Sequence, residues 1–294
     1  MLRLSIAAVL TLIAFASNSI LNKAAVGAGH ISVGDFAIWR VSAGAVVLIL
    51  ISLILRKGEV VNILFSSPKL RVYGGICLAT YMLGFSFAYL ELDAGLGTLL
   101  LFGSVQLTMF GASILLREVL TMRRILGSVI ALGGLVWLLL PEGKITLPFN
   151  AVLSMIVAGI GWGGYSLLGR QAKDPIPETA MNFCVALIIC VTALFFFPQT
   201  SPTPPDSTGL TLAIISGAIT SGCGYSLWYT ILPHLGAARA GLAQLSVPPL
   251  AIFGGIILLN ETLTLHLILA SLVVIGGVAY GLINSRCFKG KQKG

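Results

Sequence analysis

Aromatic side chains recur at helical spacing in three stretches of the sequence. Within each stretch the rings are mostly three or four residues apart, so they share one face of a helix. The rings concerned are those of Tyr81, Phe85, Tyr89, Trp162, Tyr165, Tyr225, Trp228 and Tyr229. If these faces converge, they line a pocket suited to a small amphipathic solute. If they do not, the rings pack between helices or form a belt at the lipid interface.

Four amide side chains lie in the same apolar surroundings. They are those of Asn18, Asn22, Gln106 and Gln244. An amide in an apolar helix can hold the carboxylate or amine of a solute, or it can bond across to a neighbouring helix with no further role. Both alternatives stay open. Together with the rings other than that of Tyr89, these amides form the predicted solute-binding set.

Arg40 is the only charged residue well inside an apolar stretch. Its position, seven residues after Val33, puts it about 10 Å below the start of a helix. An arginine at the centre of a membrane helix costs roughly 2.5–3.5 kcal/mol, so a partner should offset this cost. The partner could be an anionic group of a solute or a set of helix-end carbonyls. The second alternative, a structural clamp, is favoured.

Composition shows what surrounds these residues. Hydrophobic residues make up 57% of the 294 residues, charged residues only 10%, and the mean hydropathy is +0.99. A water-soluble globule of this size could not cover its surface with so few charges. The net charge of +8 does not indicate nucleic acid, because the basic residues cluster in short gaps between apolar runs.

The apolar runs predict an all-α polytopic membrane protein with ten transmembrane helices. The predicted spans are Leu4–Asn22, Val33–Leu55, Val72–Leu90, Ala94–Leu116, Met122–Leu140, Phe149–Leu168, Thr179–Phe197, Gly209–Leu232, Ala237–Leu259 and Leu265–Ile283. With a cytoplasmic N-terminus, 15 of the 18 Lys and Arg residues fall in gaps on the inside and two on the outside. This asymmetry predicts that both termini are cytoplasmic.

Two segments repeat 143 residues apart. Leu116–Thr121 and Leu259–Thr264 share Glu, Leu and Thr, and Gly133-Gly134 recurs as Gly276-Gly277. The chain is therefore predicted to consist of two five-helix halves, 1–145 and 146–294, the second with a short basic tail. Because five is odd, the second half would enter the membrane inverted, as in many secondary transporters.

The two repeated turns and one proline pair are candidates for structural or gating roles. Glu118 and Glu261 each come just before a predicted helix, where a carboxylate favours the helix dipole. Capping is the favoured interpretation for both. Pro248 and Pro249 interrupt the ninth span, which predicts a kink that is either a hinge or only a bend.

The distribution of polar residues suggests which spans surround a path. The first, third, fourth, sixth, eighth and ninth spans are rich in them, whereas the fifth and tenth are poor. The poor spans should lie outside. No Asp or Glu falls in the middle of a span, and no nucleophile with a matching base is present. The three histidines are far apart, so no metal site is expected. No catalytic residue and no cofactor are expected either.

Four features of the sequence belong together: the ten spans, the two repeats, the Phe36-Ala37-Ile38-Trp39-Arg40 stretch and the two Glu-x-Leu-Thr turns. In these features the chain resembles the EamA-type branch of the drug/metabolite transporter superfamily. The resemblance covers nearly the whole chain. Many members have a proline in the fourth helix near Val105, where this chain has Gln106, so its two gating segments are less symmetrical.

The resemblance and the repeat together imply a secondary transporter in the inner (plasma) membrane. It would act by alternating access, as an exporter of small organic solutes such as amino acids, metabolites or drugs. The alternatives are an intramembrane enzyme acting on a lipid-linked substrate and a non-transporting scaffold. The expected partners are a small-molecule solute and the lipid bilayer, with a homodimer as an option and no nucleic acid.

Overall fold

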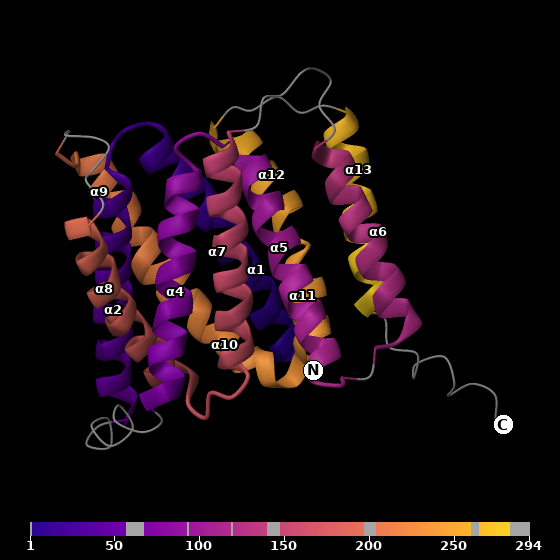
Figure 1. The fold of residues 1–294 in the computed structure, drawn as a ribbon, viewed down its shortest axis with the longest axis horizontal. Coiled ribbons are helices and arrows are strands. Elements are labelled where there is room, and N and C mark those ends of the chain that lie inside the picture. Colours follow the sequence, from indigo (N-terminus) through magenta and orange to yellow (C-terminus); the bar gives the residue numbers. More distant parts are fainter. Residues whose placement is uncertain are drawn as a thin grey trace.

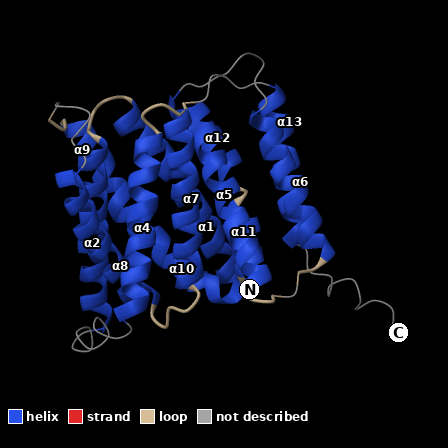
Figure 2. Cartoon of the chain, viewed as in Figure 1, coloured by secondary structure: helices blue, strands red, loops and turns tan. Residues whose placement is uncertain are grey.

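The computed structural model describes residues 2–56, 68–92, 94–118, 120–139, 148–196, 204–259 and 265–282. Within them the chain forms α-helices and two π-helical segments, η1 and η3, and no strand. The helices lie side by side along a common direction (Figure 1), and loops join their ends at the two faces of the bundle (Figure 2).

The helices follow the predicted apolar runs closely. Their bounds are α1 Leu2–Asn22, η1 Lys23–Gly27, α2 Val33–Arg56, α4 Pro68–Ala88, α5 Ala94–Leu115, α6 Met122–Leu139, α7 Phe149–Gly169, α8 Pro175–Phe196, α9 Ser207–Ile215, η3 Ser216–Cys223, α10 Gly224–Leu235, α11 Ala237–Gln244, α12 Val247–Leu259 and α13 Leu265–Leu282.

Eight helical stretches of the described residues are long and apolar enough to cross a membrane. The remaining two helices, α6 and α13, have 18 residues each. The all-helical prediction is therefore confirmed, and the chain is a multi-pass membrane protein. The count of ten spans and the inverted relation of the two halves stay predictions.

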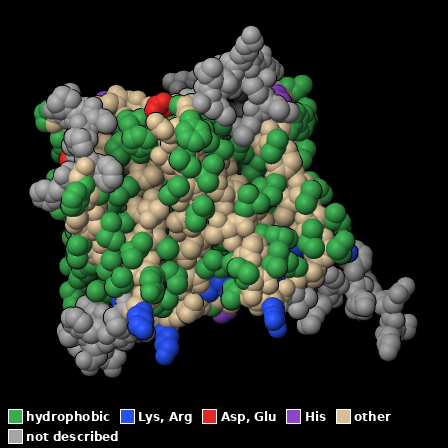
Figure 3. Space-filling model, in the orientation of Figure 1, with side chains coloured by type: hydrophobic (Ala, Val, Ile, Leu, Met, Phe, Trp, Pro, Cys, Tyr) green, Lys and Arg blue, Asp and Glu red, His purple; other side chains and the backbone are tan. Residues whose placement is uncertain are grey.

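The outer surface of the bundle is apolar. Large hydrophobic side chains such as those of Leu115, Phe149 and Ile257 are 75–85% or so exposed. Figure 3 shows hydrophobic side chains over the visible face, with most of its Lys and Arg side chains near the lower edge. This exterior suits lipid, and the basic edge fits the predicted cytoplasmic side.

The helices α6 and α13 pack against each other at one edge of the bundle (Figure 1). Glycines permit this close contact, because a Cβ on Gly127 would meet the backbone of Gly277 and Gly281. This is small-residue packing between membrane helices. The two polar-poor spans thus lie together, as expected for helices outside a central path.

The predicted ninth span is divided into two helices. α11 ends at Gln244 and α12 begins at Val247, so the break comes before the two prolines. Pro248 and Pro249 lie in the first turn of α12, where no intrahelical partner needs their missing N–H groups. The prolines therefore start a new helix after the break.

The helix α2 and the segment η3 approach each other at backbone distance. A Cβ on Gly217 would collide with the backbone carbonyl of Arg40, and one on Gly44 would collide with the ring of Phe183. The π-helical turn Ser216–Cys223 lies against α2 here. This contact brings Arg40 close to the polar residues of η3.

Replacing Gly217 by alanine should therefore destabilise the protein. Overpacking of this kind costs about 1–3 kcal/mol, and the thermal midpoint in detergent should fall. Gly276→Ala is the matched control, because nothing lies within 4 Å of the added Cβ. An unchanged midpoint in Gly217→Ala, equal to that of Gly276→Ala, would contradict this packing.

Candidate functional site

The rings identified in the sequence meet in the middle of the bundle. The ring centroids of Trp162 and Tyr225 are 4.6 Å apart, and those of Tyr81 and Trp162 are 4.9 Å apart. Tyr165 and Tyr229 are separated by 4.7 Å. The helices α4, α7 and α10 thus turn their aromatic faces toward one point. We call the set the aromatic cluster: Phe15, Tyr81, Phe85, Tyr89, Trp162, Tyr165, Phe183, Tyr225, Trp228 and Tyr229.

Two members of the cluster were missed in the sequence. Phe15 on α1 lies 5.0 Å from Trp162 and 5.4 Å from Trp228, and Phe183 on α8 lies 5.9 Å from Tyr225. A single Phe in an apolar helix gives no pattern. For Phe15 a signal did exist, because Phe15 and Asn18 are three residues apart and share a helix face.

The cluster is closed in this conformation. Each of its rings is at most 4% exposed, and the rings contact one another. The faces converge as the prediction of a pocket requires, but in this conformation the rings pack against one another and leave no pocket between them that is lined by these residues. Aromatic rings at 4.5–7 Å in tilted or edge-to-face pairs attract each other, which stabilises this packed arrangement.

Arg40 is the polar centre of the cluster. It donates from Nε to Ser221 Oγ at 2.9 Å, and from Nη2 to the hydroxyls of Tyr225 at 2.8 Å and Tyr81 at 3.3 Å. Its guanidinium also lies over the rings of Tyr81 and Phe85. The sequence favoured a clamp on helix-end carbonyls. This detail was wrong, because the partners are three hydroxyls from α4, η3 and α10.

Asn18 joins the same network from α1. Its Oδ1 accepts hydrogen bonds from Ser216, Thr220 and Ser221. All three donors belong to η3, where the π-helical turn brings hydroxyls at positions 216, 220 and 221 to one side. Isolated π-helical turns often occur at functional sites. Ser221 therefore links Asn18 to Arg40.

The other three predicted amides each bond to a different partner. Asn22 Nδ2 donates to Ser86 Oγ at 2.8 Å, and Gln106 Nε2 donates to Ser128 Oγ at 2.9 Å. Gln244 Oε1 accepts from Trp162 Nε1. Gln244 thus contacts the aromatic cluster directly, whereas Gln106 connects α5 to α6 away from it.

Two further hydrogen bonds hold the rings of α10. Trp228 Nε1 donates to Ser166 Oγ at 3.0 Å, and the hydroxyl of Tyr229 accepts from Asn182 Nδ2 at 3.1 Å. The helix α8, which carries Asn182, is also joined to α4 by a buried ion pair: Arg71 Nε and Glu178 Oε2 are 3.0 Å apart. Ser166, Asn182 and Ser221 are polar partners that no spacing in the sequence identified.

Glu118 binds a different helix end from the one expected. Its Oε1 pairs with Arg170 Nη2 at 2.6 Å and accepts from the amide of Ala237, the first residue of α11, at 3.3 Å. It therefore stabilises the N-terminus of α11, not that of the helix that follows it. We call these three residues the basic-side link. The second predicted cap, Glu261, lies outside the described residues.

The pKa of Glu118 lies below its ordinary value. Burial alone would raise this pKa, but the amide of Ala237 and the guanidinium of Arg170 lower it further than burial raises it. The carboxylate form therefore holds the link.

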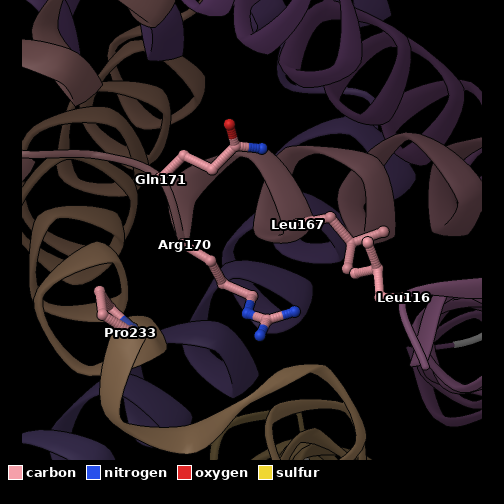
Figure 4. Close-up of a pocket in the computed structure, with 5 residues that line it drawn as sticks. All are labelled: Leu116, Leu167, Arg170, Gln171 and Pro233. Atoms are coloured by element: carbon pink, nitrogen blue, oxygen red, sulfur yellow. The ribbon is translucent and has the colours of Figure 1, made fainter. Parts of the chain in front are cut away.

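A pocket of about 350 Å³ opens beside the basic-side link. Figure 4 shows the side chains that line it. They are Leu116, Leu167, Arg170, Gln171 and Pro233. None of the predicted solute-binding residues lines this pocket. Two of them are close in sequence to residues that do: Tyr165 is two residues before Leu167, and Tyr229 is four residues before Pro233. Among the described residues, no group of three or more His, Cys, Asp or Glu side chains could hold a metal ion.

The stability of the protein should depend on the protonation of Glu118. Because the pKa of Glu118 is lowered in the folded protein, the ionised carboxylate stabilises the fold. This stabilisation is fully present at a pH above the ordinary carboxyl pKa of about 4.3, and it is lost as the pH falls through the lowered pKa. The thermal midpoint of Glu118→Gln should therefore change less than that of the wild type when the pH falls from 6 to 3 or so. Glu91→Gln, at an exposed loop position, is the control. Equal pH profiles for Glu118→Gln and the wild type would exclude the link.

Three known proteins match much of the chain in sequence. A protein of Pseudomonas aeruginosa, "Uncharacterized protein PA1977", is 40% identical over 275 residues, which cover 92% of this chain and 91% of that protein. "Uncharacterized transporter YoaV" of Bacillus subtilis is 24% identical over 169 residues, 55% of this chain and 58% of that protein. An "Uncharacterized transporter" of Archaeoglobus fulgidus is 25% identical over 212 residues, 72% of this chain and 76% of that protein.

A solved crystal structure has the same fold. It superposes with a TM-score of 0.75 at 19% sequence identity, covering 94% of this chain and 98% of that chain. The EamA-like transporter family matches residues 149–282, which lie within the predicted second half. Residues 149–282 therefore belong to the EamA-like transporter family, and together with the relatives named as transporters this match identifies the chain as a membrane transporter of the drug/metabolite transporter superfamily.

Proposed function

We propose that the protein is a secondary transporter that exports small organic solutes across the inner membrane by alternating access. One observation carries this proposal: a buried polar and aromatic centre lies between the two predicted halves of an otherwise apolar bundle. Arg40 and Tyr81 come from the first half, and Trp162, Ser221 and Tyr225 come from the second. A solute bound there would contact both halves at once.

Polar contacts between the predicted halves lie on both sides of this centre. On the basic side, Glu118 binds Arg170 and Ala237. On the opposite side, His30 Nδ1 and Asp206 Oδ2 are 2.6 Å apart, and Asp206 N donates to the carbonyl of His30. Rocking of one half against the other would break one set of contacts and keep the second. Two closures that open in turn are what alternating access requires.

The pocket on the basic side supports entry of the solute from the cytoplasm. Leu167 lies five residues after Trp162 on α7, which is about 7.5 Å along the helix. Pro233 lies four and eight residues after Tyr229 and Tyr225 on α10. A solute that enters from the cytoplasm would therefore meet these rings in order before it reaches Arg40.

Counterflow in proteoliposomes tests the proposal. Vesicles preloaded with an amino acid or a small metabolite should take up the labelled solute only when the protein is present. Trp228→Phe, which loses the bond to Ser166, should lower the initial rate about tenfold, which corresponds to a barrier increase near 1.4 kcal/mol. Phe149→Ala, at a position 75% exposed on the bundle surface, is the control.

Two results would contradict the proposal. One is the absence of counterflow for every member of a broad panel of amino acids and metabolites. The other is a normal rate for folded Trp228→Phe and Tyr81→Ala, because transport would then bypass the aromatic cluster.

A further inference from the structure

We infer that Arg40 is the solute-recognising group of this transporter and that its solutes are small organic carboxylates with an apolar body. This inference rests on the proposed function and adds the class of solute. It starts from the charge of Arg40, which is 0% exposed. Its hydrogen-bond partners are the hydroxyls of Ser221, Tyr225 and Tyr81, which carry no charge.

Nothing in the described part of the chain neutralises this guanidinium. Its Nη1 has no hydrogen-bond partner there, and no ion pair joins Arg40 to a carboxylate. The carboxylates of Glu118 and Glu178 are paired with Arg170 and Arg71. A buried charge without a counterion is costly, and an anionic ligand is the chemistry that offsets the cost.

The N–H groups of Nη1 are left without a partner and can bind such a ligand. Nε and Nη2 are fixed by Ser221 and Tyr225 at 2.9 and 2.8 Å, so the guanidinium plane is held in place. The bond from Nη2 to Tyr81 is longer, 3.3 Å, as is the bond from Tyr225 to Tyr81. A carboxylate that replaced the Tyr81 hydroxyl would bind Nη1 and Nη2 together, at the 2.7–2.9 Å or so typical of charge-assisted pairs.

Asn18 offers a second donor near the same point. Its Oδ1 is occupied by hydroxyls of η3, whereas its Nδ2 has no partner in the described residues and the side chain is 1% exposed. Ser221 touches both Asn18 and Arg40. Two unpartnered buried donors around one hydroxyl indicate a ligand rich in acceptors, which favours an anion over an amine.

The aromatic cluster defines the rest of the solute. The guanidinium carbon lies 5.6 and 5.5 Å from the ring centroids of Tyr81 and Phe85, and Trp162 and Phe15 continue this surface. A body bound beside the carboxylate would contact ring faces and edges. Such surroundings suit an apolar or flat group.

Three probes with one body and different head groups test this inference. They are phenylacetate, 2-phenylacetamide and phenethylamine, titrated onto the purified protein in detergent with the thermal midpoint and tryptophan fluorescence as readouts. Phenylacetate should raise the midpoint with saturation, and the amide and amine should not. Arg40→Gln should weaken phenylacetate binding at least tenfold. Arg239→Gln, an arginine at the start of α11, is the control.

A second variant keeps the test valid if Arg40→Gln fails to fold. Tyr81→Phe removes the hydroxyl that competes for Nη2, so phenylacetate should bind this variant at least as tightly as the wild type. If Arg40 were only a structural clamp, Tyr81→Phe would lower the midpoint and no carboxylate would restore it.

Several outcomes would overturn the inference. They are equal binding of the amide and the carboxylate, unchanged binding in folded Arg40→Gln, and no binding of phenylacetate to the wild type at millimolar concentrations. Transport of a solute without a carboxylate, at equal rates by the wild type and Arg40→Gln, would reject this inference and leave the proposed function intact. Carboxylate binding at Arg40 without any counterflow would reject the proposed function alone.

Discussion

A guanidinium held away from water is the constraint on which the centre of this protein depends. Arg40 is completely buried in a bundle whose exterior is apolar, so its charge must be stabilised from within. Hydroxyls of Ser221, Tyr81 and Tyr225 supply part of this stabilisation, and the rings of Tyr81 and Phe85 supply another part. Each of these partners comes from a helix other than α2, so one side chain determines how four segments meet.

The arrangement around Arg40 follows from this requirement. Gly217 lets η3 approach the backbone of α2, and the π-helical turn directs its hydroxyls toward Asn18 and Arg40. The aromatic rings fill the remaining space and exclude water, which strengthens each polar contact in the centre. On the basic side, the basic-side link joins the two predicted halves. In this conformation the polar centre is therefore covered on all sides by packed side chains.

Much of the fold could be predicted from the sequence, because membrane helices require long apolar runs that are easy to recognise. The aromatic faces could also be found, since rings at i, i+3 and i+4 must share a side. The hydrogen-bond partners of Arg40 and Glu118 could not be predicted from the sequence. Hydrogen bonds between Arg40 and Ser221, or between Glu118 and Ala237, join residues more than 100 positions apart. Their pairing depends on how the helices pack, which spacing along one helix does not reveal. The proline pair indicated that the ninth span is interrupted, but not that one helix ends at Gln244 and another begins at Val247, because proline is tolerated both at a kink and at the start of a helix.

Access of water-soluble reagents to the centre tests the central claim most directly. Ser221→Cys, in a chain whose five native cysteines are replaced, puts a thiol beside Arg40. If the centre is the solute path, a small methanethiosulfonate reagent should label this thiol, at a rate that changes when a transported solute is added. Gln171→Cys at the rim of the pocket should react in all conditions. A Ser221→Cys thiol that reacts from neither side of the membrane, with or without solute, would show that the cluster is a permanent structural core.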